Sequence, residues 1–159
     1  MVENKEIDSF PVFEEWLELY DWISQQNINV FVSSNNLDTL NLGSQAFGLY
    51  CLINMGDING DGGDEIAVVI DYADWSSLNS CKIYTYCKGK WKELFKYYIH
   101  EGSLSWRVND SLQKFTEIPG FLGKRKDKWY YMDSGENEAV EDTTLYNKLH
   151  PLIIKKKCR

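Results

Sequence analysis

Residues 57–65 read Asp-Ile-Asn-Gly-Asp-Gly-Gly-Asp-Glu, and they run directly into the apolar stretch Ile66–Ile70. Oxygen-bearing side chains stand at the first, third and fifth positions of this segment, and glycine stands at the sixth. Hard cations such as Ca²⁺ bind oxygen ligands at this spacing, because alternate side chains converge and the glycine allows a sharp turn. The segment therefore predicts a cation-binding turn that opens into a β-strand.

Two other interpretations of this segment are an EF-hand loop and a solvated turn. An EF-hand loop places its bidentate acid at position twelve, inside a helix. Position twelve here is Val68, which has no coordinating atom, so the EF-hand is excluded. A solvated turn of the Asn-Gly and Asp-Gly type is the simpler alternative to a metal site. Acids crowded into nine positions repel one another unless a cation neutralises them, and this favours the metal.

The spacing of these residues also resembles a known family, the FG-GAP (VCBS-type) repeat of integrin-like β-propellers. The motif that carries the resemblance is Asp57-x-Asn59-x-Asp61-Gly62-x-x-Glu65. It covers about residues 55–71 and can extend through the following hairpin to Tyr98. In that family the loop binds Ca²⁺ between two strands of one blade.

The resemblance implies a structural Ca²⁺ in this chain. Its expected ligands are the Gly63 carbonyl and four side chains, those of Asp57, Asn59, Asp61 and Glu65. Most copies of the repeat carry Asp at the ninth position, where this chain has Glu65, so Asp64 is the substitute ligand. A complete propeller needs several blades, and a chain with one such loop is not one.

The length and the two ends of the chain bound its class. At 159 residues it suits a single domain, residues 1–159. No apolar run approaches the roughly 20 residues that cross a bilayer, and the charged N-terminus lacks the apolar core of a signal peptide. We expect a complete chain to be cytoplasmic. If a signal peptide has been removed, the sequence instead suits a periplasmic or cell-surface protein.

Charge and cysteine content limit the partners and metals that can be expected. The net charge of −7 disfavours nucleic acid, and it favours a basic protein partner or simply keeps the protein soluble. The four cysteines have no C-x-x-C spacing, so zinc is not expected. Three pairings are open to them, and buried free thiols are the default expectation.

The residue patterns predict an α+β fold. Residues 9–25 have the apolar spacing of an amphipathic helix, which should pack on a mainly antiparallel sheet built of hairpins. Residues 50–98 are expected to form a blade-like meander, with the Ile66–Ile70 strand at its centre and a hairpin around Lys88-Gly89-Lys90. Residues 99–159 should hold a second hairpin and the C-terminal tail. Residues 33–44 resemble a loop, and residues 103–117 are ambiguous.

The second hairpin is predicted from a short echo of the first. The sequence Lys88-Gly89-Lys90-Trp91 is followed later by Lys126-Asp127-Lys128-Trp129. The strand 129–132 is expected to pair with residues 120–123 or 118–122.

No catalytic constellation stands out, so we expect a non-enzymatic binding module. The function that fits its size and acidity is an inhibitor or immunity-type protein that covers a cationic partner. The expected contact residues are acids and loop tryptophans: Asp71, Asp74, Trp75, Trp106, Glu136, Glu138 and Glu141. One alternative is a carbohydrate or cell-surface binding module, and a second is a hydrolase that uses His100.

Overall fold

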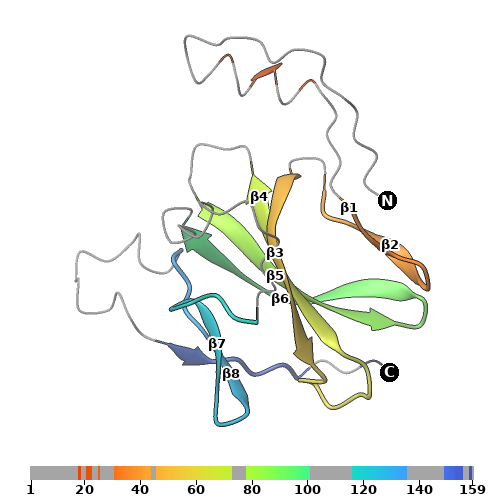
Figure 1. The fold of residues 1–159 in the computed structure, drawn as a ribbon, viewed down its shortest axis with the longest axis vertical. Coiled ribbons are helices and arrows are strands. Elements are labelled where there is room, and N and C mark those ends of the chain that lie inside the picture. Colours follow the sequence, from red (N-terminus) through yellow and green to blue (C-terminus); the bar gives the residue numbers. More distant parts are fainter. Residues whose placement is uncertain are drawn as a thin grey trace.

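The computed structural model describes residues 31–43, 46–72, 78–100, 116–135, 149–155 and 158, together with Glu18, Asp21, Trp22 and Gln25. Within these residues the chain forms nine strands in three antiparallel sheets (Figure 1). No helix in this part is long and apolar enough to span a membrane.

The sheets follow chain order. The first sheet pairs β1 (Phe31–Ser34) with β2 (Leu37–Asn41). The central sheet is a meander of β3 (Ala46–Gly56), β4 (Glu65–Tyr72), β5 (Leu78–Cys87) and β6 (Lys90–His100). The third sheet consists of β7 (Leu122–Arg125), β8 (Lys128–Tyr131) and β9 (His150–Pro151).

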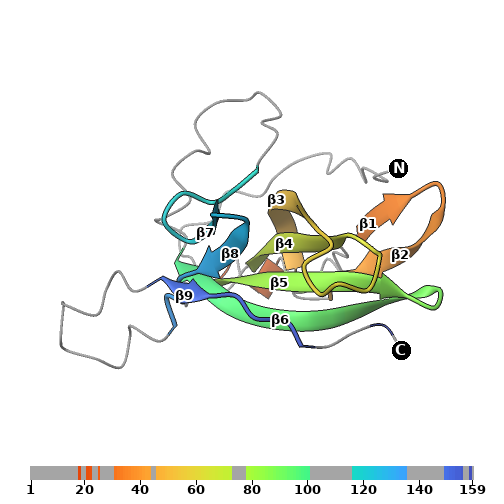
Figure 2. The same cartoon turned by 90° about the horizontal axis from the view of Figure 1, so that it is seen from below.

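The core lies on both faces of β4, and the central position predicted for this strand is confirmed. Val69 packs in one apolar cluster with Trp129 of β8, whereas Val68 packs in a second cluster with Leu40 of β2. Neighbouring strand residues point to opposite faces of a sheet. The β7–β8 hairpin therefore covers one face of the meander and β1–β2 covers the other. Both views place these hairpins at opposite ends of the central sheet (Figures 1 and 2).

Both predicted hairpins are present, and their turns are of one kind. Lys88 and Gly89 have φ of 51° and 77°, and Lys126 and Asp127 have φ of 46° and 63°. Two consecutive positive φ angles define a type I′ turn, whose twist matches that of paired strands. The two-residue turn fixes the partner of β8 as Leu122–Arg125, so the predicted partner segments began two to four residues too early.

The predicted α+β class is wrong for the described part of the chain, which contains antiparallel strands and no helix element. Most of the predicted helix at 9–25 lies outside the described residues. The segment 33–44, predicted as a loop, holds most of β1 and β2. Its polar composition is misleading because only Leu40 of these two strands is buried, so the outward residues are free to be Ser, Asn and Asp.

Candidate cation-binding turn

The acidic segment forms the turn between β3 and β4, at the end of the first hairpin of the central sheet (Figure 1). Gly60 and Gly62 have φ of 71° and 94°. This left-handed region strains any residue with a side chain, so these two glycines allow the chain to reverse here. The sharp turn that the sequence predicted is present.

Side chains of the turn accept hydrogen bonds from its own backbone. Oδ1 of Asp57 accepts from the N–H groups of Gly60 and Asp61, at 2.7 and 3.0 Å. Its Oδ2 accepts from the N–H of Gly62 at 3.0 Å. Oδ1 of Asn59 accepts from the N–H of Asp61 at 2.8 Å. These amide dipoles offset part of the repulsion between the crowded acids.

Glu65, the predicted ninth-position ligand, is fully buried. Its Oε2 accepts from the N–H groups of Ile58 and Asn59 at 2.9 and 3.3 Å, and its Oε1 accepts from Nδ2 of Asn59 at 2.7 Å. Burial raises the pKa of Glu65 above its ordinary value, although these hydrogen bonds favour the charged form. The carboxyl group thus ties the start of β4 to the start of the turn.

Asp64, the predicted substitute ligand, is directed toward β3. Its Oδ2 accepts a hydrogen bond from Nδ2 of Asn54 at 3.0 Å. Asn54 in turn uses its Oδ1 to accept from the N–H of Gly56 at 2.8 Å. These two hydrogen bonds connect β3 to the end of the turn, on the exposed side of the hairpin.

The donor chemistry of the turn fits a hard cation. A carboxylate offers about four acceptor positions, and Asp57 uses three of them for turn amides, so one remains for a metal. The amide oxygen of Asn59 likewise has a second acceptor position beyond its bond to Asp61. In the described part, no three His, Cys, Asp or Glu side chains converge as a metal-holding group. The structure supplies the turn but not a complete ligand set.

A contact that the sequence did not reveal joins the turn to the C-terminal tail. Oδ2 of Asp61 accepts a hydrogen bond from the N–H of Cys158 at 2.9 Å. Cys158 forms a disulfide with Cys87 at the end of β5, 71 residues earlier. The expectation of four free thiols is therefore wrong for this pair. No spacing motif marks it, because a disulfide between distant residues depends on tertiary structure.

The other two cysteines are free and buried, as the default expectation has it. Cys51 and Cys81 stand on either side of Val69 in one cross-strand row of the central sheet. Burial raises the pKa of each thiol to about 12. Both thiols are consequently protonated at neutral pH and belong to the core.

Of the predicted partner-binding residues, Asp71 is the one that lies within the described part of the chain. Asp71 lies half-buried near the end of β4, opposite Gly48 of β3. The remaining predicted contacts lie outside the described residues: Asp74, Trp75, Trp106, Glu136, Glu138 and Glu141.

His100, the residue of the hydrolase alternative, ends β6 in an exposed position. Its backbone N–H donates to Oγ of Ser134 at 3.1 Å, which ties the end of β6 to the segment after β8.

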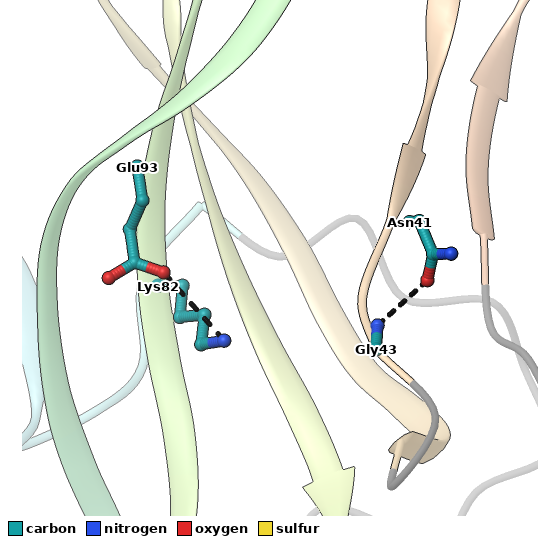
Figure 3. Close-up of polar contacts among 4 residues, drawn as sticks. All are labelled: Asn41, Gly43, Lys82 and Glu93. Atoms are coloured by element: carbon teal, nitrogen blue, oxygen red, sulfur yellow. Dashed lines mark hydrogen bonds and ion pairs between the residues drawn. The ribbon is translucent and has the colours of Figure 1, made fainter.

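Two further polar contacts support the sheets rather than a site (Figure 3). Nζ of Lys82 lies 3.7 Å from Oε2 of Glu93, so this ion pair bridges the neighbouring strands β5 and β6. Oδ1 of Asn41 accepts from the N–H of Gly43 at 2.8 Å and shapes the exit from β2.

Comparisons of the chain with protein-family models, with curated proteins and with solved structures found no match. In its described part the molecule is a layered antiparallel β-protein, and the turn at 57–65 is its candidate functional site.

Proposed function

We propose that this chain is a non-enzymatic, calcium-stabilised β-module that acts by binding a protein. The observation that carries the proposal is the 57–65 turn. It sets Asp57, Asn59 and Asp61 around a glycine-containing reversal at the end of the central hairpin. A cation held there would join β3 to β4 and stabilise the whole meander.

The resemblance of this turn to the FG-GAP loop supports Ca²⁺ as the cation. When bound, Ca²⁺ would supply positive charge that neutralises the acids. Its role would be structural, with oxygen atoms as its ligands. Asp57, Asn59 and Asp61 would hold it, with the Gly63 carbonyl. Glu65 would either coordinate the cation directly or hold the turn backbone in place through its hydrogen bonds to the amides of Ile58 and Asn59.

Thermal unfolding with and without Ca²⁺ tests the metal. Chelator-treated protein should melt at a higher temperature after Ca²⁺ is added, and Mg²⁺ at equal concentration should do less. At ten times the dissociation constant, the gain is about 1.4 kcal/mol. The variant Asp57→Asn should lose this response, whereas Asp38→Asn on β2, outside the turn, should keep it. An unchanged melting temperature in 10 mM Ca²⁺ would refute the calcium proposal.

The proposed partner is a basic protein, in the manner of an inhibitor or immunity protein. A net charge of −7 accelerates encounter with a cationic surface and keeps the module soluble. Capture of proteins from the native host on the immobilised module tests this. Charge reversal at Asp71, and separately at Glu136, Glu138 and Glu141, should weaken capture and make it less salt-dependent. Recovery of no basic protein would count against the proposal.

The disulfide supports the extracytoplasmic alternative for localisation. Disulfides persist in oxidising compartments and are rare where thiols are kept reduced. Such compartments also hold more free Ca²⁺ than the cytosol. We therefore propose that the protein works in the periplasm or at the cell surface, and alkylation of freshly lysed cells would test this. Full labelling of Cys87 and Cys158 in the cell would contradict it.

A further inference from the structure

The carboxylate of Asp61, a proposed cation ligand, is held at both of its oxygens. Oδ1 accepts from the N–H of Gly63 at 3.1 Å, within the turn. Oδ2 accepts from the N–H of Cys158 at 2.9 Å, across 97 residues of sequence. The orientation of this side chain therefore depends on a segment that comes from the opposite end of the chain.

The C-terminal segment reaches the turn as an extension of the third sheet. The N–H of Leu152 donates to the carbonyl of Trp129 at 2.8 Å, which anchors the segment to β8. The described residues that follow this bond, 153–155 and 158, form no strand, and Ile153 is 66% exposed. Holding the Cys158 amide at Asp61 costs ordering entropy in this segment, and one hydrogen bond offsets only part of that cost.

The disulfide removes that entropic cost. Cys87 is buried at the end of β5, where it pairs with Lys90 of β6, and it is covalently bonded to Cys158. The amide of Cys158 is consequently kept beside Asp61 whenever the bond is formed. Reduction would free the tail, and Asp61 would lose the hydrogen bond that the Cys158 amide donates to it.

We propose that Cys158 is a positioning residue for the cation site and that the Cys87–Cys158 disulfide controls the affinity of that site. This inference rests on the proposed calcium function. Hydrogen bonds that orient metal ligands are typically worth a 10–100-fold difference in metal affinity. The turn would then bind its cation fully only in the oxidised protein, so that export to an oxidising compartment completes the site.

The experiment compares Ca²⁺ binding by calorimetry in oxidised and reduced full-length protein. Reduced protein should bind Ca²⁺ at least about tenfold more weakly. The variant Cys87→Ser/Cys158→Ser is the matched control: it should bind like reduced protein, and added reductant should not change it. If the double variant does not fold, the single variant Cys158→Ser, which keeps the Cys87 thiol, takes its place as the control.

A second measurement separates a local effect from general loosening. Hydrogen exchange on metal-free protein should show that reduction exposes the amide of Gly63, which donates to Asp61, while the amide of Val69 in β4 stays protected. Equal Ca²⁺ affinity in both redox states would overturn this inference and leave the calcium site intact. Failure of oxidised protein to bind Ca²⁺ at 10 mM would instead overturn the proposed function, and this inference with it.

Discussion

Glu65 shows how one buried acid organises the turn. Among the described residues it is the one carboxylic acid that is buried. Its oxygens accept hydrogen bonds from the backbone N–H groups of Ile58 and Asn59 and from the Asn59 side chain. A buried carboxylate that lost these donors would be costly, so the turn and the strand start stabilise each other. The same burial makes this residue sensitive to pH.

The raised pKa of Glu65 predicts a specific pH dependence. In the unfolded chain the group titrates near its ordinary value of 4.5, and in the folded protein it titrates higher because of burial. The folded state therefore binds the proton more tightly. The stability contributed by this group is full below pH 4.5 and is lost as the pH rises through the folded pKa.

Urea unfolding of metal-free wild type and of Glu65→Gln across pH 4 to 8 tests this prediction. The amide does not titrate, so the wild type should lose stability relative to the variant as the pH rises. Parallel curves for Glu65→Gln and wild type would show that its pKa is not raised.

The residues of the turn were predictable because the signal is local. Oxygen side chains at positions one, three and five and glycine at six need no knowledge of distant residues. The roles of Glu65 and Cys158 were not predictable in the same way. Burial of Glu65 depends on how the central sheet packs, and the bond of Cys158 to Asp61 joins opposite parts of the chain.

At the level of elements, the repeated tryptophan of the two hairpins brings separate sheets together. Nε1 of Trp129 in β8 donates to the carbonyl of Met55 in β3 at 3.0 Å, in a buried position. Nε1 of Trp91 in β6 donates to the carbonyl of Asp38 in β2 at 2.6 Å, near the surface. Each indole thus connects an outer hairpin to the central meander, one on each face.

The hydrogen bonds donated by the Trp129 and Trp91 indoles should contribute different amounts to the free energy of unfolding. Trp129→Phe leaves the buried Met55 carbonyl without its donor, so we expect a loss of about 1–3 kcal/mol in the free energy of unfolding, with a further loss from packing. Trp91→Phe should cost less, because water can reach the Asp38 carbonyl. Urea unfolding of both variants measures the difference. A larger loss for Trp91→Phe would contradict this ranking.

Substitutions in the β7–β8 turn should make the folded protein more stable. Lys126 and Asp127 adopt the left-handed conformation that Asn and Gly favour in type I′ turns. The double variant Lys126→Asn/Asp127→Gly should raise the free energy of unfolding by about 1 kcal/mol. Lys88→Asn in the first turn, where Gly89 is already present, should gain less. A loss of stability in the double variant would mean that these side chains make contacts worth more than the relieved strain.

The element predictions succeeded where hydrophobic pattern and turn chemistry agreed. β4 is apolar on both faces and lies inside the sheet, and β5 and β6 follow from their turn. The pattern failed for β1 and β2, which present one buried residue among polar ones. A strand that covers the edge of a core needs little apolar surface of its own, so its sequence resembles a loop. With that hairpin and β7–β8 on the two faces, the described core closes without a helix.

At the scale of the whole molecule, the disulfide connects parts that chain order separates. It links the central sheet to the tail that leaves the third sheet, and it encloses the segment from 87 to 158. In the loop-entropy model, a closure of 71 residues stabilises the folded state by about 4 kcal/mol. Reduction should therefore lower the melting temperature by more than Trp91→Phe does.

The four cysteines also report on the whole fold through their reactivity. A thiol with a pKa of about 12 is ionised in roughly one molecule in ten thousand at pH 8, and Cys51 and Cys81 are also inaccessible. Native oxidised protein should therefore take up no iodoacetamide. In urea without reductant it should take up two labels per chain, and peptide mapping should place them on Cys51 and Cys81. Labels on Cys87 or Cys158 would refute the pairing, and with it the link between redox state and the acidic turn.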